Sequence, residues 1–195
     1  AQDIINAKQG ELAAELLLLD KLSKKLRKKR QQNGSINFES SEVKFILDNN
    51  NNPIDVYFKK SLSTNHLIEE FMLLANKTVA KHIGFPQKEA KPFVYRVHDL
   101  PDNDRIESLN NIVKKFGHAI NAKNSNSLSI SLNNLLKNVK GNPEQQMIET
   151  LTIRSMAKAI YTTANIGHYG LAFNYYSHFT SPIRRYPDLI VHRLL

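Results

Sequence analysis

Apolar residues recur at helical spacing along the first thirty positions of the chain. They are Ile5, Leu12, Leu16, Leu19, Leu22 and Leu26, at steps of three, four and seven. Residues at these spacings share one face of a helix, so the pattern predicts a single helix from about Asp3 to about Arg30, ending before Asn33-Gly34. Its last turns read KKLRKKR, which is either a solvated helix end that complements the macrodipole or a contact for a polyanion.

Two runs of alternating character come next. SINFESSEVKFIL spans 35–47, IDVYFKK spans 54–60, and DNNNNP between them holds no core-forming residue. Alternation is typical of strands, and a polar run with asparagine and proline is typical of a turn. We therefore expect a β-hairpin, or two strands of a sheet joined by a surface turn.

A second helix is expected from Ser63 to about Ile83, with Gly84 as its stop. The residues of its apolar face are Ile68, Phe71, Met72, Ala75 and Val79, and Glu69 and Glu70 lie beside that face. PFVYRVHD then predicts a strand. PDNDRIESLNNIVKKFGHAI begins with acids and proline before it becomes helical.

The second half of the chain completes the order of elements. NSLSISLNNLLKNVKG and PEQQMIETLTIRSMAKAIYT predict two further helices, with Pro143 in the first turn of the second. ANIGHYGLAFNYYSHFT predicts strand and turn, and the last helix should begin at Pro182 with Ser181 as its N-cap. The order α, β-β, α, β, three α, β, α indicates an α+β fold, a helix-rich mixed domain with a small, mainly antiparallel sheet.

Composition narrows the class of protein. Hydrophobic residues make up 41% of the 195, which excludes a disordered chain, and no apolar run approaches the roughly 18 residues that span a bilayer. We therefore expect no membrane partner. The absence of cysteine excludes disulfides and thiolate metal sites and fits a cytoplasmic protein. The formal charge of +9 favours a polyanion such as nucleic acid.

The segment HFTSPIRRYPD has the composition of a phosphate site. At the predicted helix start, free N–H groups and the macrodipole would lie beside the guanidinium groups of Arg184 and Arg185. Neighbours on a helix point roughly 100° apart, so we do not expect both to bind the same phosphate. Asp188 lies four residues after Arg184 and three after Arg185, where it can pair with either. The alternative is an Arg–Asp ion pair on a helix surface.

Three blocks of the sequence resemble the catalytic RNB domain of the ribonuclease II and ribonuclease R family. HYGLAFNYYSHFTSPIRRYPDLIVHRLL is similar to the signature of the family, and LIEEFMLLANKTVAKHI and PFVYRVHDLPD resemble two further blocks in the same order. The resemblance covers essentially the whole chain, and RRYPD is more similar to the ribonuclease R form. It implies part of a processive enzyme that degrades single-stranded RNA from the 3′ end to nucleoside 5′-monophosphates with Mg²⁺.

The resemblance also implies roles for individual residues. Arg184, in SPIR, would contact the phosphate at the reaction centre and assist catalysis. Glu70 or Glu69, in the EE pair, would help to hold the 3′-terminal nucleotide. A carboxylate near a ribose can accept hydrogen bonds from its hydroxyl groups, which would help to distinguish RNA from DNA.

Further candidate RNA contacts surround the arginines. Arg185 is a second cation, and Tyr175 and Tyr169 are candidate rings for stacking on bases, with packing in a core as the alternative. His178 either makes a hydrogen bond near the phosphate or only orients a loop. The seven histidines show no ligand spacing with a carboxylate, so we expect no metal site in this chain.

One part of the family pattern is missing from this sequence. The family holds its metal with closely spaced aspartates, whereas only Asp102 and Asp104 lie close together here, where they suit the N-terminal charge of a helix. We therefore expect residues 1–195 to be a partial RNB domain without the upstream aspartate segment, the end of the domain, and the flanking cold-shock-like and S1 domains. Mg²⁺ would then bind outside this chain.

Two functions remain open at this point. The first is a piece of an exoribonuclease with no appreciable activity of its own. The second is a nuclease-dead RNA-binding module or scaffold. In both cases the expected partner is single-stranded RNA, and no stable protein partner is implied.

Overall fold

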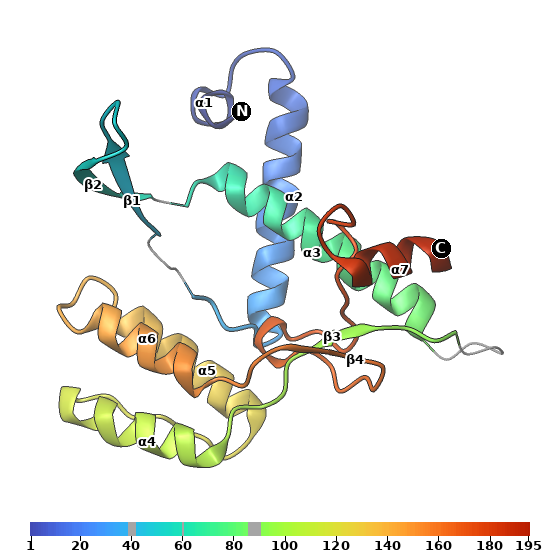
Figure 1. Ribbon diagram of the computed structural model, residues 1–195. Helices are drawn as coiled ribbons and strands as arrows, with labels where there is room; N and C mark the ends of the chain where they lie inside the picture. The colour runs from blue at the N-terminus through green and yellow to red at the C-terminus, as the bar shows by residue number, and fades with distance from the viewer. Residues whose placement is uncertain (39–41, 60, 86–90) are drawn as a thin grey trace. The chain divides into compact units, whose positions relative to one another are not determined.

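The computed structural model of the chain describes residues 1–38, 42–59, 61–85 and 91–195. Residues 39–41 and 60 of the two predicted strands lie outside this part. The chain forms two compact units, one of Ala1–Arg27 and Phe38–Phe71, the other of Lys28–Asn37 and Met72–Leu195. Two long helices, α2 (Ala13–Gln32) and α3 (Ser63–Gly84), contribute residues to both units (Figure 1).

The N-terminal segment forms two helices, so the prediction of a single one is wrong. α1 covers Gln2–Ala7, and α2 begins only after a break of five residues. Within the break, Lys8, Gly10 and Leu12 have φ angles of 57°, 123° and 57°. Positive φ is incompatible with a right-handed helix, and glycine adopts it at little cost. Gly10 therefore marks the point where the chain reverses.

The apolar stripe of α2 does not form its buried face. Leu19 and Leu22 are exposed, whereas Asp20, Ser23 and Arg30 are buried. The buried residues also recur at helical steps, but they are polar. Periodicity of apolar residues thus predicted a helix here without predicting which side is buried.

The predicted hairpin is present in the first unit. β1 (Glu42–Leu47) and β2 (Pro53–Lys59) pair antiparallel. The turn is organised by Asp48, whose carboxylate accepts the N–H groups of Asn50 and Asn52, both at 2.8 Å. These bonds, that from Asn52 above all, lower the pKa of Asp48. The asparagine-rich run is therefore a turn for a specific reason: its amides bind one carboxylate.

α3 confirms the second predicted helix and its stop. The Oε1 atom of Gln2 accepts the N–H group of Thr64 at 3.1 Å and so caps the first turn. The buried positions of α3 are Leu67, Glu70, Leu73, Asn76 and Ala80. The predicted apolar face is only partly correct, because Ile68 and Met72 are exposed. Its other members, Phe71, Ala75 and Val79, are partly buried. Two polar residues occupy buried positions and shift the face.

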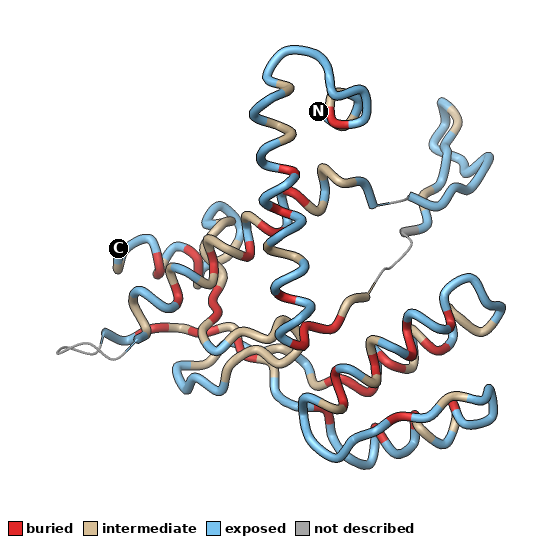
Figure 2. Tube along the Cα trace, turned by 180° about the vertical axis from the view of Figure 1, so that it is seen from behind, coloured by how far each residue is buried: buried red, intermediate tan, exposed pale blue. Residues whose placement is uncertain are grey.

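Three helices pack together in the second unit. α4 (Asn103–Val113) and α5 (Ser125–Asn138) both contact α6 (Gln145–Ser155), and their buried residues follow one side of each helix in Figure 2. Asp102 is the N-cap of α4 and accepts the N–H group of Asp104 at 2.9 Å, as its place before a helix predicted. Pro143 precedes the N-cap of α6, so its predicted place in the first turn is wrong.

A short antiparallel sheet joins the segments before and after these helices. β3 (Tyr95–Val97) confirms a predicted strand, whereas β4 (Ile160–Thr162) lies where helix was predicted. Three residues are too few to show strand periodicity, and β4 extends because it pairs with β3. With two small antiparallel sheets among many helices, the predicted α+β class is confirmed.

The core beside this sheet connects α3, β3 and α7 (Tyr186–Leu194). It consists of Ala80, Phe93, Tyr95, Val97 and Val191. The Tyr95 hydroxyl donates to the carbonyl of Gly84 at 3.1 Å, and a Cβ at Gly84 would overlap that hydroxyl. The glycine that ends α3 therefore also makes room for a core ring.

Candidate functional site

The two arginines lie in a turn, Ser181–Arg185, which we name the arginine turn. The backbone N–H groups of Arg184 and Arg185 lie 3.3 and 3.2 Å from the carbonyl oxygen of Ser181 and donate to it, and α7 begins only after them. The predicted helix start at Pro182 with Ser181 as N-cap is therefore wrong. Pro187, in the first turn of α7, supplies the proline start signal five residues later. Since α7 begins only at Tyr186, the N-terminal end of a helix dipole cannot account for an anion site at Ser181.

Asp188 fixes the arginine turn from inside. It is 0% exposed, and its Oδ2 atom accepts the N–H group of Ser181 at 2.8 Å and the Nη2 atom of Arg185 at 2.7 Å. Of the two pairings that the sequence left open, the structure contains the one with Arg185. A buried carboxylate without such partners would be strongly unfavourable. Arg185 therefore serves to hold the turn.

Arg184 extends from the same turn toward solvent. Its side chain is exposed and makes no hydrogen bond or ion pair with the part of the chain that the structure describes. Ile183 beside it is 96% exposed. A guanidinium group offers five donors in a planar fork, which suits phosphate oxygens. The turn thus exposes one guanidinium group to solvent and engages the other in an internal ion pair.

Asn76 anchors the segment that leads into the arginine turn. It is buried in α3, donates through Nδ2 to the Tyr176 hydroxyl at 3.2 Å, and accepts the N–H group of Phe179 at 2.9 Å. Burial raises the pKa of Tyr176, so its hydroxyl stays protonated. Sequence reasoning missed Asn76. The signal was its position, three residues after a buried leucine, on the buried side of α3.

His178 lies in a layer of rings and cations. Its Nδ1 atom is 2.6 Å from the Tyr161 hydroxyl, and the guanidinium of Arg96 lies 4.7 Å from the centre of the Tyr161 ring. Burial, followed by the charge of Arg185, lowers the pKa of His178 to about 4. The imidazole is therefore neutral at pH 7, and its Nδ1 atom forms a hydrogen bond with the Tyr161 hydroxyl. This contact agrees with the orienting role, and a hydrogen bond of His178 near the phosphate stays a prediction.

Sequence reasoning also missed Arg96 and Tyr161. They are direct partners across β3 and β4. The backbone N–H of Arg96 additionally donates to the carbonyl of Tyr176 at 2.9 Å. This pairing was not visible in the sequence because β4 was expected to be helical.

Tyr169 belongs to a tight loop that contains the short helix η2 (Tyr169–Leu171), where strand and turn were predicted. The N–H group of His168 donates to the carbonyl of Phe173 at 2.8 Å and closes the loop. Ala172, with φ 55°, reverses the chain, so no continuous strand forms. The Tyr169 hydroxyl donates to the carbonyl of Ser125 at 3.4 Å, and burial raises its pKa. The ring is thus held against the start of α5.

Tyr175 lies half-buried at the edge of the core. Its ring centre is 6.1 Å from that of Phe85 and 6.5 Å from that of Tyr95. Most of the Tyr175 ring is thus surrounded by other aromatic rings, as expected for the alternative in which it packs in a core. One side of the ring also lines a pocket, described below.

Glu69 and Glu70 belong to the first unit. Glu70 is 3% exposed, whereas Glu69 is exposed, with one carboxylate oxygen 3.4 Å from Nδ1 of His66. Consecutive residues on a helix point in different directions, which explains the contrast. The two carboxylates that the sequence could not separate thus differ clearly in exposure.

The described residues contain no group of three His, Cys, Asp or Glu side chains that could hold a metal ion. None of the helices in the described ranges has both the length and the apolar character to cross a membrane.

Comparisons with known proteins place these features in a family context. The RNB domain model matches residues 1–195. The chain is 47% identical over 179 residues to ribonuclease R of Thermotoga maritima, covering 89% of this chain and 24% of that protein. It thus spans about a quarter of the length of that relative.

Solved structures show the same similarity. A structure of Mycoplasma genitalium RNase R in complex with ribose-methylated single-stranded RNA matches with a TM-score of 0.85 and 30% identity, over 98% of this chain and 30% of that one. Yeast Ssd1, a pseudonuclease, matches with a TM-score of 0.69 and 20% identity, over 99% of this chain and 24% of that one. The second similarity concerns the fold alone.

Proposed function

Because the chain belongs to the RNB domain family, we propose that it is part of a 3′-to-5′ exoribonuclease that acts on single-stranded RNA. The observation that carries the proposal is the arginine turn, in which a buried Arg185–Asp188 pair holds an exposed Arg184 in place. The T. maritima relative is ribonuclease R, and the M. genitalium enzyme was solved with single-stranded RNA. Both support RNA as the anion that Arg184 binds.

The reaction is hydrolysis of the last phosphodiester. Water adds to phosphorus, the bond from phosphorus to the 3′ oxygen of the preceding nucleotide breaks, that oxygen takes a proton, and a nucleoside 5′-monophosphate leaves. Negative charge grows on the non-bridging oxygens during attack. Arg184 stabilises that charge, whereas Arg185 acts through the turn as a positioning residue.

Other residues receive supporting roles in this proposal. Glu70 or Glu69 accepts hydrogen bonds from the terminal ribose, and Tyr175 and Tyr169 provide rings near the strand. His178, neutral and bonded to Tyr161, keeps the segment before the arginine turn in place. The enzyme acts in the cytoplasm and needs no stable protein partner.

The metal belongs outside this chain. Mg²⁺, when bound, polarises the phosphate and lowers the pKa of a bound water. The described residues offer no ligand group for it, so we place its ligands upstream of residue 1 and expect the chain alone to have no appreciable nuclease activity.

The alternative is a nuclease-dead RNA-binding module. It is favoured by the lack of a metal-ligand group among the described residues. In such a module Arg184 would bind the RNA backbone without contributing to turnover.

Degradation of labelled single-stranded RNA with Mg²⁺ tests the proposal, with the chain alone and with a version extended upstream in its parent protein. We expect digestion to 5′-monophosphates only by the extended version. There, Arg184→Ala should lower kcat by about 10²–10³-fold, whereas Lys137→Ala on α5 should not. If the extended version binds RNA but does not cleave it, the module is the correct function. Digestion by the chain alone would show that the metal ligands lie within residues 1–195.

A further inference from the structure

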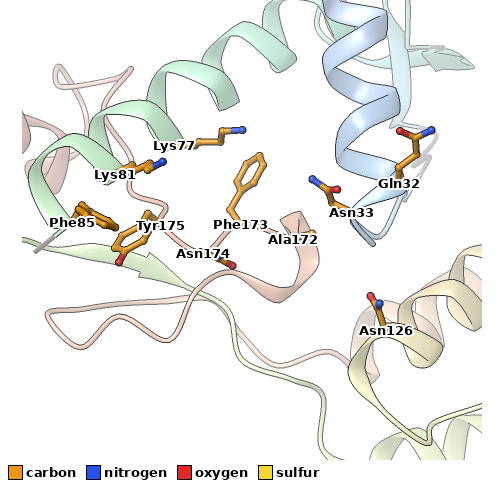
Figure 3. Close-up of a pocket in the computed structure, with 10 residues that line it drawn as sticks. All are labelled: Gln32, Asn33, Lys77, Lys81, Phe85, Asn126, Ala172, Phe173, Asn174 and Tyr175. Atoms are coloured by element: carbon orange, nitrogen blue, oxygen red, sulfur yellow. The ribbon is translucent and has the colours of Figure 1, made fainter.

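A pocket of about 710 Å³ opens in the second unit, and none of its lining residues belongs to the arginine turn. Its walls come from the last turns of α3, the end of α2, the start of α5 and the loop before Tyr176 (Figure 3). The lining residues are Gln32, Asn33, Lys77, Lys81, Phe85, Asn126, Ala172, Phe173, Asn174 and Tyr175. Its volume falls in the range of small-ligand sites.

One wall of the pocket is formed by one side of the end of α3 and by Phe85, which directly follows that helix. Lys77, Lys81 and Phe85 follow one another at steps of four, so they lie on one side of the helix end. Each step advances about 6 Å along the axis. The two lysines thus extend from successive turns of one helix side, from which each can contact a phosphate of an extended strand, with a ring beside them.

The charge of the lining selects the kind of ligand. None of the ten described lining residues is an aspartate or glutamate, and two are lysines. The Nζ atom of Lys77 lies 5.2 Å from the centre of the Phe173 ring, which holds it at the wall. Lys81 is exposed. The pocket therefore favours an anion, and lysine binds phosphate as a point charge.

Aromatic rings line the same space. Phe85 is 53% exposed, and its ring centre lies 6.1 Å from that of Tyr175. An exposed ring supported by a second ring is a platform on which a base can stack. Phe173 owes its place to the closed loop, since His168 binds its carbonyl and Ala172 adopts positive φ. A residue in this conformation costs energy, and such strain often occurs at binding sites.

In Figure 3, Asn33 and Asn126 lie across from Lys77 and Lys81, whereas Asn174 lies between Phe173 and Tyr175. Asn33 lies at the end of α2, Asn126 in the first turn of α5, and Asn174 in the loop. Their side chains make no hydrogen bond within the part of the chain that is described. Each can both donate and accept, which suits base edges and ribose hydroxyls.

We propose that this pocket is a second RNA site, in which Lys81 and Lys77 bind backbone phosphates, Phe85 stacks on a base, and the asparagine amides contact the base edge or ribose. The proposal rests on the function proposed above and adds a binding site whose lining does not include Arg184. Its ligand is a nucleotide within a strand, because the two lysines of α3 can bind two successive phosphates of a strand, whereas a mononucleotide offers only one.

Fluorescence anisotropy with a labelled single-stranded oligoribonucleotide of roughly eight nucleotides tests it. Lys81→Ala should raise Kd several-fold and reduce the slope of log K against log salt by about 0.7, the value for one phosphate of a single strand. Phe85→Ala should raise Kd about fivefold or more through lost stacking. Lys137→Ala, an exposed lysine outside the pocket, is the control and should stay within about twofold. Both pocket substitutions are at exposed side chains, and circular dichroism confirms that each variant is folded.

The outcomes separate this site from the proposed function. If Arg184→Ala weakens binding but Lys81→Ala and Phe85→Ala match the control, the pocket proposal is wrong and the proposed function stands. If the wild-type chain binds no RNA at low salt, the pocket proposal is wrong, whereas the proposed function is still decided by the digestion assay with the extended version. Competition with 5′-adenosine monophosphate distinguishes the source of the nucleotide: binding of the mononucleotide without binding of the strand overturns the proposal.

Discussion

Replacement of Asp188 by asparagine should destabilise the chain more than any conservative surface change. The substitution keeps the size of the side chain but removes the charge that pairs with Arg185. Loss of one partner of a buried pair costs about 3–5 kcal/mol, because the other charge remains desolvated. The Arg185 side chain is 19% exposed and can regain some hydration, so we expect the lower end, about 3 kcal/mol.

Thermal unfolding followed by circular dichroism measures this cost. For a chain of this size, about 3 kcal/mol corresponds to a fall in Tm of about 6–12 °C. Glu107→Gln, an exposed residue of α4, removes the same charge without a buried partner and should change stability by less than about 0.5 kcal/mol.

A double-mutant cycle isolates the pair itself. Asp188→Asn combined with Arg185→Gln should cost less than the sum of the single changes, by about 0.5–3 kcal/mol, because no unpaired charge remains. A Tm for Asp188→Asn equal to that of Glu107→Gln, or strictly additive losses in the cycle, would refute the view that this ion pair holds the arginine turn.

Two further predictions concern the second unit. In the folded chain the pKa values of His168 and His178 are about 3 and about 4, below the ordinary value of 6.5. As the pH falls, these histidines therefore bind protons in the unfolded chain before they do so in the folded chain. Tm should accordingly be highest above about pH 6.5 and decline toward pH 4. Tm measured between pH 7 and 5 checks this, and His178→Gln should decline less; a flat profile for the wild type contradicts it. Gly84→Ala should lower stability by about 1–3 kcal/mol because its Cβ would overlap the Tyr95 hydroxyl. Tyr95→Phe in the same chain should restore part of the loss, and urea denaturation that shows equal stability for Gly84→Ala and wild type would exclude the overlap.

Long helices and the hairpin turn could be predicted because their signals are local. Ser63–Gly84 carries both its periodicity and its stop, and Asp48 binds amides only two and four residues away. The failures involve distant partners or local reversals. β4 is extended because β3 pairs with it, and the helix at Gly10 breaks because of backbone angles that apolar spacing does not report.

The candidate site divides in the same way. The spacing of Arg184, Arg185 and Asp188 predicted an ion pair between the aspartate and one of the arginines, and the ion pair is present. Which arginine pairs, and which remains exposed, depended on the position of α7 and on the burial of Asp188. The sequence did not identify Arg96, Tyr161 and Asn76 because their partners are distant in the chain. Arg96 and Tyr161 pair with each other across two strands, and Asn76 bonds to Tyr176 and Phe179.

The sequence by itself determined the order of most elements, the α+β class, the positive charge and the family, because periodicity, composition and motifs are properties of residues near one another in the chain. Only the tertiary structure decided which faces are buried, which arginine is engaged by Asp188, and that lysines, rings and amides from four separate segments line one pocket. The physical reason is that burial and pairing depend on which distant segments meet. A buried carboxylate or amide is stable only where such a segment supplies its hydrogen-bond partners.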